Sequence, residues 1–452
     1  MTNFSDLIFI CRFLPVFLIA YYVTPLKYKR LVLLLGSLLF YAVGDLKMFP
    51  VLLGAVIINY LFSKALRGGG CKALLAFVVI LDAIMLVEFK LLSQFADQSL
   101  MPVGISFFTF KMISFQVDNF RGEISSEPDF VDTAAYFCMF PQVVSGPIMR
   151  YEAYDKNIYL KEKVQLTDIL SSIEDGLRFF IVGLGMKVLL ADYLSMLWND
   201  IGTIGYESIS TPLAWLGAVT YSMELYFDFW GYSLMAAGLG VMLGFPFIVN
   251  FDQPYSSKNV AEFYRRWHAS LGSFFRDYIY FPMGGSRKGT ARTILNLLTV
   301  WLVTGFWHGV TLNFILWGLI IFAIIVCEKY VLVKLPDVLG NFIGRINVLV
   351  LIPLTWVVFA ISDKVQLLDY FKRLFPFFGA GISVNENDFI KNLTVYGVIL
   401  AFGVILLIPK VYDFFEDHRK HPLMSAALFI LFWACVYSLS NAAGNPFMYF
   451  RF

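Results

Sequence analysis

The chain has 452 residues, of which 59% are hydrophobic and only 15% are charged. Soluble domains carry about a quarter charged residues and about half apolar ones, so this composition excludes an ordinary soluble enzyme and indicates that lipid is the solvent. A formal net charge of +2 gives no support to nucleic-acid binding. The five cysteines form no CxxC motif and no Cys/His pair, so they predict neither a metal site nor a disulfide.

Long apolar runs recur along the chain, and a run of about 20 apolar residues crosses a bilayer as a helix. Backbone groups in lipid must be paired internally, so the runs predict an all-α polytopic membrane protein. The first run is expected to be a retained span, because no basic segment precedes it and no small-residue cleavage site closes it. The predicted spans are Leu7–Val23, Leu31–Val43, Met48–Leu66, Ala73–Leu92, Leu177–Leu197, Leu213–Phe227, Phe229–Phe247, Ile294–Trp307, Phe314–Val333, Val348–Ile361, Val395–Leu407 and Leu423–Leu439.

Two further apolar stretches, Met101–Phe120 and Tyr136–Met149, are interrupted by proline, glycine, glutamine or serine. Irregular backbone at membrane depth is tolerated only where it is buried in protein or lines a cavity. We therefore expect both stretches to be re-entrant or broken helices.

Basic residues in short loops predict the orientation, since such loops stay in the cytoplasm. Lysine and arginine follow the first and third predicted spans, whereas the leading MTNFSD has neither. The N-terminus is therefore predicted to face outward. The segment from Lys258 to Arg292 carries seven basic residues and is predicted to be cytoplasmic.

That basic segment has a pattern typical of an amphipathic helix in the membrane interface. Ser257 can cap a helix that begins near Asn259, and the polar face carries Glu262, Arg266 and Ser270. Apolar residues recur at helical spacing at Phe263, Trp267, Leu271, Phe274, Phe275 and Tyr278. From the residues alone, an electrostatic anchor on anionic lipid is the simpler explanation of this helix.

His308 is the strongest candidate for chemistry, because it lies within an apolar stretch, TGFWHGVTLNF. An ionisable residue within the membrane indicates a functional site, although a core histidine bonded to a carbonyl fits the residues equally well. Gly305 and Gly309 flank the histidine and would let a ligand approach. The same stretch supplies polar groups from Thr304, Thr311 and Asn313.

The length of the helix pair around His308 carries a second argument. Only 35 residues separate Arg292 from Glu328, whereas two full spans need about 40 residues plus a turn. The pair must therefore be short, broken or set in locally thinned membrane. If its first helix begins near Thr293, His308 lies about 22 Å along it. At that depth a neutral imidazole could accept the proton of a hydroxyl that attacks an acyl carbonyl.

Several blocks carry a resemblance to a known family. They are PVGISFFTF at Pro102, FPQVVSGPI at Phe140, YFDFWGYSLMAAGLG at Tyr226, NFDQPYSSKNVAEFYRRWHASLGSFFRDYIYFPMGGSRKG at Asn250, GFWHGVTLNFILWG at Gly305 and NPFMYFRF at Asn445. In these blocks the chain resembles the membrane-bound O-acyltransferases. It is most similar to the branch of the alginate and peptidoglycan O-acetyltransferase membrane subunits. The motif PMGGSRKG favours this branch over that of the D-alanine exporter. At Leu234 the chain departs from that branch, which commonly reads GYSDMA where this chain reads GYSLMA.

The resemblance implies a ring of about 11 to 13 transmembrane and re-entrant helices around a thinned centre. Cytoplasmic and extracytoplasmic funnels would meet near the buried histidine, in a bacterial cytoplasmic membrane. A single domain is expected over residues 1–452. It would comprise N-terminal helices in 1–100, a catalytic core in 101–325 and C-terminal helices in 326–452.

The resemblance also implies roles for individual residues. His308 matches the family's catalytic histidine, and His268 matches a second histidine on the cytoplasmic segment, which would then shape the donor entrance. Arg265, Arg266 and Arg276 could attract the phosphates of coenzyme A, although snorkelling of their stems explains each of them as well. Further candidates for binding donor or substrate are Trp267, Trp307 and Asn313. No metal site and no bound cofactor are implied.

The final residues, FMYFRF, are typical of an interfacial aromatic anchor. By the resemblance, they also match the F-x-Y-x-x-F ending of a small partner protein in the D-alanine system, whose tyrosine is proposed to carry the acyl group. Tyr449 is therefore a candidate acyl carrier. Deprotonated by His308, its hydroxyl could accept the acetyl group and later release it outside the membrane.

The sequence thus predicts acetyl transfer from a cytoplasmic thioester, expected to be acetyl-CoA, with His308 as general base. The expected partners are an extracytoplasmic acetyltransferase and a cell-surface or secreted polysaccharide acceptor. Two alternatives stay open. One is an acyltransferase of the same family with another donor, such as a D-alanyl carrier protein. The other is a secondary transporter, although the internal repeats common in that class are not found.

Overall fold

The computed structural model describes residues 3–124, 127, 129–158, 165–378 and 383–441. Within these ranges the regular structure is helical, which confirms the predicted all-α class. Among the described residues, seven helical runs are long and apolar enough to cross a membrane: Phe49–Leu66, Gln98–Arg121, Leu166–Ile204, Leu312–Lys334, Asp337–Ala360, Asp388–Leu406 and Pro422–Asn441. The chain is therefore a multi-pass membrane protein.

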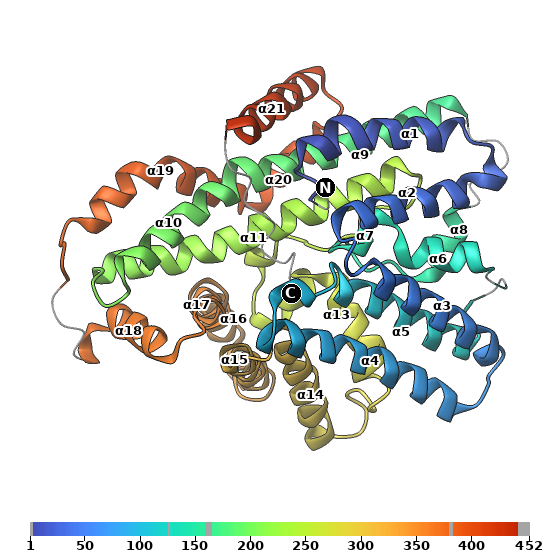
Figure 1. The fold of residues 1–452 in the computed structure, drawn as a ribbon. Coiled ribbons are helices and arrows are strands. Elements are labelled where there is room, and N and C mark those ends of the chain that lie inside the picture. The colour runs from blue at the N-terminus through green and yellow to red at the C-terminus, as the bar shows by residue number, and fades with distance from the viewer. Residues whose placement is uncertain (1–2, 125–126, 128, 159–164, 379–382, 442–452) are drawn as a thin grey trace.

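Helix α11 (Thr211–Met242) runs through the middle of the molecule (Figure 1). The prediction of two spans here, interrupted at Asp228, is wrong, because one 32-residue helix continues through that position. Lys187 explains the continuity: its Nζ lies 2.8 Å from Oδ1 of Asp228 and 2.6 Å from Oδ1 of Asp192. Paired in this way, the carboxylate can lie inside the helix bundle.

Lys187 itself lies on a π-helical turn within a long helical run beside α11. That turn joins two α-helices into a run over Leu166–Ile204, which exceeds the predicted span at both ends. Glycines bring the run and α11 into close contact, because a Cβ on Gly183 would lie 2.4 Å from the carbonyl oxygen of Gly231. The elements are α9 (Leu166–Gly185), η4 (Met186–Ala191) and α10 (Asp192–Ile204).

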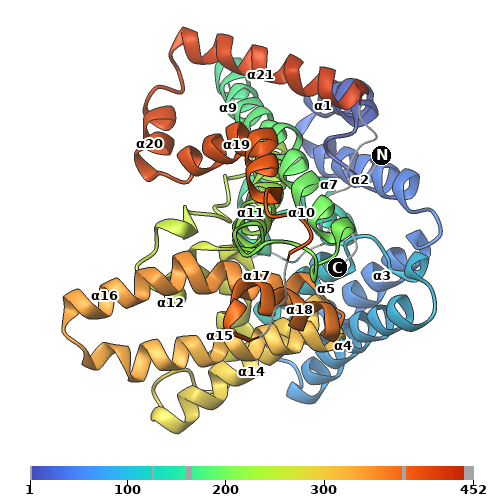
Figure 2. The same ribbon diagram turned by 90° about the vertical axis from the view of Figure 1, so that its left-hand side faces the viewer.

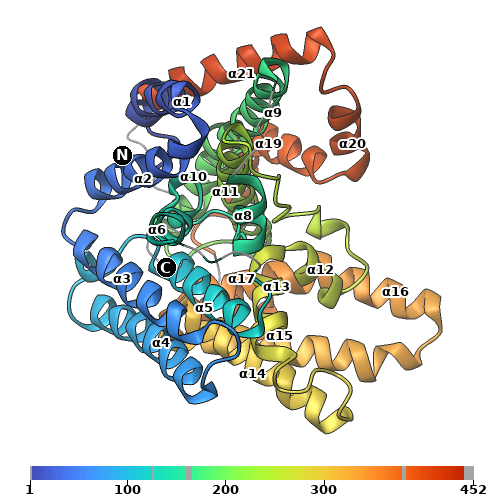
Figure 3. The same cartoon turned by 90° about the vertical axis from the view of Figure 1, so that its right-hand side faces the viewer.

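The N-terminal helices form one side of the molecule, as Figure 3 shows on its left. Their bounds agree with the predicted spans to within a few residues. They are η1 (Phe9–Phe13), α1 (Leu14–Val23), α2 (Lys29–Gly44), α3 (Phe49–Leu66) and α4 (Lys72–Phe95).

Of the two stretches expected to be broken, only one is. Helix α5 (Ile105–Arg121) is continuous, because Gly104 with φ 70° starts it and polar side chains on it donate to a neighbouring helix. Nε2 of Gln116, for example, donates to the carbonyl oxygen of Asn59 at 2.7 Å. The second stretch does break, at Met139. There the chain passes from α6 (Phe130–Cys138) to α7 (Phe140–Val143), and α8 (Tyr151–Ile158) follows.

The amphipathic segment is not one helix in the interface. Asn259, rather than Ser257, caps its start by accepting from the backbone N–H of Glu262 at 2.8 Å. Its apolar face packs inside the protein, and Ser270 of the expected polar face is also buried. The elements are α12 (Val260–Arg266), α13 (Ala269–Phe275) and the π-helical turn η6 (Arg276–Tyr280). A simple lipid anchor is therefore the wrong interpretation.

The helix pair around His308 is short and unbroken. Helices α14 (Thr290–His308) and α15 (Leu312–Tyr330) have 19 residues each, or about 28 Å at the usual rise. A Cβ on Gly305 would lie 2.6 Å from the carbonyl oxygen of Phe314. Gly305 thus allows close packing of the two helices, which corrects the expectation that it opens space for a ligand.

The remaining helices complete two opposite edges of the molecule. Figure 2 shows α14 to α16 at one edge and α19 to α21 at the other. Helices α19 and α21 are mostly exposed, as lipid-facing helices are. The bounds are α16 (Asp337–Ile346), η8 (Asn347–Leu351), α17 (Ile352–Ala360), α18 (Lys364–Leu374), α19 (Asp388–Leu406), α20 (Pro409–Asp417) and α21 (Pro422–Asn441).

Candidate active site

His308 is the last residue of α14 and is enclosed by aromatic rings. Its side chain is 7% exposed. The ring centroid lies 4.4 Å from that of Trp307, 4.9 Å from Phe359 and 5.2 Å from Trp317, the last two in edge-to-face geometry. The helix ends here because Gly309 leaves the helical conformation. The imidazole is therefore held in a largely dry, apolar setting.

His268 lies at a sharp break between α12 and α13. Its φ of 48° is left-handed, a conformation that a residue with a side chain seldom adopts. The backbone on both sides is tied to the strand-like segment after α11: the N–H of Ala269 donates to the carbonyl oxygen of Asn250 at 2.9 Å, and the N–H of Asp252 donates to that of Arg266 at 3.0 Å. The break turns the side chain of His268 into the protein, where it is 4% exposed.

Asn250 determines which ring nitrogen of His268 carries the proton. Nδ2 of Asn250 donates to Oγ of Ser233 at 2.9 Å, so Oδ1 is the atom that lies 2.9 Å from Nδ1 of His268. The same Oδ1 accepts from the N–H and Oγ of Ser270 at 3.2 and 2.8 Å. Because an amide oxygen only accepts, Nδ1 carries the proton and Nε2 is the free basic atom.

The second ring nitrogen of His268 is left available. Nε2 is buried, and no described residue forms a hydrogen bond with it. Burial lowers the pKa of His268 to about 3, so the ring is neutral at physiological pH. A neutral ring with a free Nε2 can accept one hydrogen bond from a ligand.

The two histidines line one cavity of about 860 Å³. Its inner walls are mainly aromatic, from Phe229, Tyr264, Trp267, Trp301 and Trp317. Its exposed part carries three cationic side chains, Arg265, Arg276 and Lys329, and one carboxylate, Glu328. The cavity thus combines an apolar interior, in which both histidines lie, with a positively charged entrance.

Three of the six residues predicted to bind donor or substrate line this cavity: Arg265, Trp267 and Arg276. Arg266 does not line it, because its guanidinium is bound to Glu262 at 2.8 Å. Trp307 lies next to both histidines, with its ring centroid 4.4 Å from that of His308 and 6.3 Å from that of His268. Nδ2 of Asn313 donates to the carbonyl oxygen of Phe359 at 2.8 Å, a contact that joins α15 to α17. Tyr449 lies outside the described residues.

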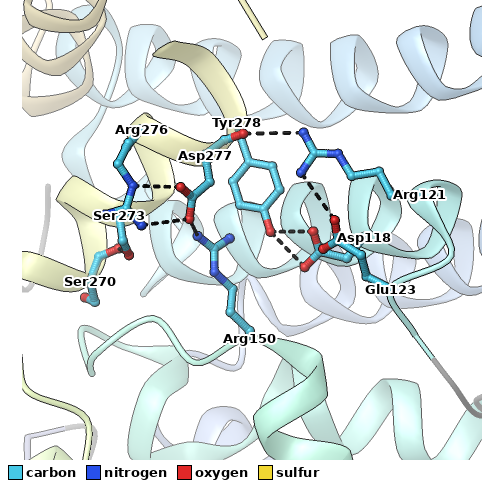
Figure 4. A network of polar contacts seen from close by, with 9 residues as sticks. All are labelled: Asp118, Arg121, Glu123, Arg150, Ser270, Ser273, Arg276, Asp277 and Tyr278. Carbon is cyan, nitrogen blue, oxygen red and sulfur yellow. Dashed lines mark hydrogen bonds and ion pairs between the residues drawn. The ribbon is translucent and has the colours of Figure 1, made fainter. Parts of the chain in front are cut away.

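A polar network holds the segment at the entrance in place (Figure 4). The hydroxyl of Tyr278 donates to both carboxylate oxygens of Asp118 on α5, at 2.6 and 2.7 Å. Burial raises the pKa of Tyr278, so the hydroxyl stays protonated and remains a donor. Asp277 binds Arg150 at 3.1 Å and Nε of Arg276 at 2.8 Å. The network thereby fixes Arg276 at the rim of the cavity.

Sequence reasoning missed two residues of this site. The sequence does not single out Asn250, because its contact with His268 bridges 18 positions of the chain and a helix lies between them. Lys90 lies on α4, is 5% exposed, and places Nζ 5.9 Å from the ring centroid of Trp307. A charge within the apolar run Ala73–Leu92 was a visible signal for Lys90.

Comparison with known proteins identifies the family of this chain. The sequence model of the membrane-bound O-acyltransferase family, MBOAT, matches residues 13–338. A protein of Pseudomonas putida named probable alginate O-acetylase AlgI is 30% identical, over 99% of this chain and 100% of its own length. A peptidoglycan O-acetyltransferase of Helicobacter pylori is 32% identical over 70% of this chain and 68% of its own length. A teichoic acid D-alanyltransferase of Bacillus subtilis is 27% identical over 50% and 59%.

These matches cover most of the chain and define its class. The chain belongs to the membrane-bound O-acyltransferase family. It is an O-acyltransferase, which leaves the transporter alternative without support as a sole function.

Proposed function

We propose that this chain takes an acetyl group from acetyl-CoA at the cytoplasmic face and passes it to a hydroxyl acceptor, with His308 as general base. The observation that carries the proposal is the single cavity of about 860 Å³ that His308 and His268 both line. The cationic side chains at its exposed part suit the phosphates of coenzyme A. Among the described residues, neither Arg265 nor Lys329 has an ion-pair partner that would neutralise it.

In the proposed reaction, the acceptor hydroxyl gives its proton to His308 while its oxygen attacks the acyl carbonyl carbon. The carbon–sulfur bond then breaks, and the coenzyme A thiolate takes the proton from the imidazolium. The apolar walls exclude water, which would otherwise hydrolyse the thioester. The free Nε2 of His268 can accept a hydrogen bond from an amide N–H of the donor, and so help to position it.

The proposed final acceptor is a cell-surface or secreted polysaccharide. The names of the relatives from Pseudomonas putida and Helicobacter pylori, an alginate O-acetylase and a peptidoglycan O-acetyltransferase, support this class of acceptor. We further propose a location in the bacterial cytoplasmic membrane and an extracytoplasmic transferase as partner. The D-alanyl alternative has weaker support, from shorter matches such as that to the Bacillus subtilis protein.

The test uses the full chain in lipid nanodiscs with acetyl-CoA labelled in the acetyl group. His308→Ala should lower the rate of acyl transfer by about 100-fold or more, because a positioned general base contributes that much. His418→Ala is the matched control, since His418 is exposed and remote from the cavity. Full activity in the His308 variant would refute the assignment of the base, and transfer only from a D-alanyl carrier protein would refute the donor.

A separate experiment tests Tyr449 as the acyl carrier. Tyr449→Phe keeps the aromatic ring and removes the hydroxyl, so label should no longer appear on the chain. Tyr437→Phe is the matched control, because Tyr437 is an exposed tyrosine on α21. If polysaccharide acetylation in cells is complete with Tyr449→Phe, the acceptor receives the acetyl group without this carrier.

A further inference from the structure

Two buried hydrogen-bond donors next to His308 have no role in the mechanism described so far. Lys90 is 5% exposed, and no described residue forms an ion pair or hydrogen bond with its ammonium. Trp307 is 4% exposed, and its Nε1–H has no hydrogen-bond partner among the described residues. The two groups are neighbours, because Nζ of Lys90 lies 5.9 Å from the centroid of the Trp307 ring.

Both groups are close to the proposed base. The Trp307 ring lies 4.4 Å from the ring of His308, centroid to centroid. Lys90 reaches this place from α4, whereas the cavity is lined by residues of α11 to α15 and does not include Lys90. His308 therefore lines the cavity and also contacts Trp307, so the donor pair of Lys90 and Trp307 lies next to the cavity wall at His308.

An unpaired donor in an apolar interior costs free energy, and an unpaired ammonium costs more. The ammonium form of Lys90 and the indole of Trp307 offer only N–H groups and no acceptor. The ligand that would compensate them must therefore present an oxygen with negative charge, beside the base. In acyl transfer such an oxygen forms when the carbonyl carbon is attacked.

We propose that Nζ of Lys90 and Nε1–H of Trp307 form the oxyanion site of this enzyme. The inference rests on the proposed function. When the acceptor oxygen bonds to the carbonyl carbon, the π electron pair moves to the carbonyl oxygen, and His308 holds the acceptor proton. Lys90 and Trp307 donate hydrogen bonds to that oxygen. When the carbonyl re-forms, the carbon–sulfur bond breaks and the sulfur takes the proton from His308.

The same donors would suit a carboxylate of an acidic acceptor sugar, so the test must separate the two sources of charge. It uses the full chain in nanodiscs, acetyl-CoA, and two acceptors, glucuronate and the neutral methyl glucoside. Lys90→Met and Trp307→Phe each remove one donor while keeping most of the side-chain volume. The matched controls are Lys72→Met, on an exposed position of the same helix, and Trp433→Phe, on exposed α21.

With either acceptor, we expect Lys90→Met to lower kcat by about 100-fold, the usual effect of losing one oxyanion donor. The KM for acetyl-CoA should stay unchanged. Equilibrium binding of ethyl-CoA, a thioether without the carbonyl oxygen, should also stay unchanged. A folding defect would instead weaken this binding. Lys90→Arg should recover part of the loss, and the double variant with Trp307→Phe should lose less than the two single effects combined.

Two outcomes would overturn the inference. A loss confined to glucuronate and seen in its KM would assign Lys90 to the acceptor carboxylate. Wild-type kcat in Lys90→Met would leave no role for the ammonium. In both cases His308→Ala would still be inactive, so the proposed function would stand. If the wild-type chain transfers no acetyl group at all, the proposed function is refuted, and the oxyanion role that rests on it is refuted as well.

Discussion

Nδ1 of His268 lies 2.9 Å from Oδ1 of Asn250, and this contact decides which ring nitrogen carries the proton. The same oxygen holds the backbone and hydroxyl of Ser270 at the start of α13. One amide therefore sets both the tautomer of His268 and the direction of the short helix that follows it. In metal sites, loss of a residue that orients a histidine in this way typically costs about 10- to 100-fold in affinity or activity.

We expect Asn250→Ala to lower acyl transfer by about 10- to 100-fold. Removal of Oδ1 lets the His268 ring rotate and leaves buried donors of Ser270 without an acceptor. That should also lower stability by about 1–3 kcal/mol. Turnover of acetyl-CoA and the thermal midpoint in detergent measure the two effects. Asn387→Ala, at an exposed asparagine whose side chain makes no capping bond, is the control. Unchanged turnover in the Asn250 variant would contradict this role.

The arginines next to each other on α12 should differ in their effect on the donor. Arg265 lines the cavity, whereas Arg266 is bound to Glu262. Arg265→Ala should raise the KM for acetyl-CoA several-fold with little change in kcat, because it removes a charge that attracts phosphate in the ground state. Arg266→Ala should have the smaller effect on that KM. Initial rates over a range of acetyl-CoA concentrations measure both, and equal effects would disprove the distinction.

Close packing at Gly305 makes that position sensitive to a single methyl group. Gly305→Ala would place a Cβ against the carbonyl oxygen of Phe314 at 2.6 Å, so α14 and α15 must move apart. We expect a loss of about 1–3 kcal/mol in stability and a marked loss of activity, since His308 follows one turn later. Gly240→Ala on α11 is the control, because no atom lies within 4 Å of its added Cβ. Equal thermal midpoints for the two variants would refute the close approach.

The buried ion pair of Lys187 should be essential for α11 to fold. Lys187→Met would leave the carboxylate of Asp228 buried without its cation, at a cost of about 3–5 kcal/mol. The double variant Lys187→Met, Asp228→Asn should recover much of that loss. Chemical denaturation in detergent measures the effect, with Lys72→Met as the exposed control. A Lys187 variant as stable as the wild type would contradict a stabilising role for this ion pair.

Much of the fold could be predicted from apolar runs, because a membrane span depends mainly on local composition. The predictions fail where a side chain from a distant part of the sequence pairs with a polar residue inside an apolar run. Asp228 interrupts an apolar run, yet α11 continues because Lys187 from another helix pairs with it. Gln116 likewise lies inside α5, because Asn59 on α3 satisfies it.

The site could be predicted only in part, for a similar reason. His308 was visible as an ionisable residue in an apolar stretch, and Arg265 and Arg276 were visible as charges on a basic segment. The helical spacing of that segment continues through Trp267 and His268, so the spacing hides the break between α12 and α13. The break depends on Asn250, which the sequence does not place beside His268.

The left-handed backbone of His268 has a consequence for evolution and design. A φ of 48° costs a residue with a side chain about 1 kcal/mol or more in conformational free energy, whereas it costs glycine little. Glycine would therefore adopt this turn with less strain. His268→Gly should relax the backbone while it removes the imidazole. Under the role proposed for His268, a substitution that relaxes this turn would therefore lower activity. Screens for a more thermostable chain would be expected to select against function here.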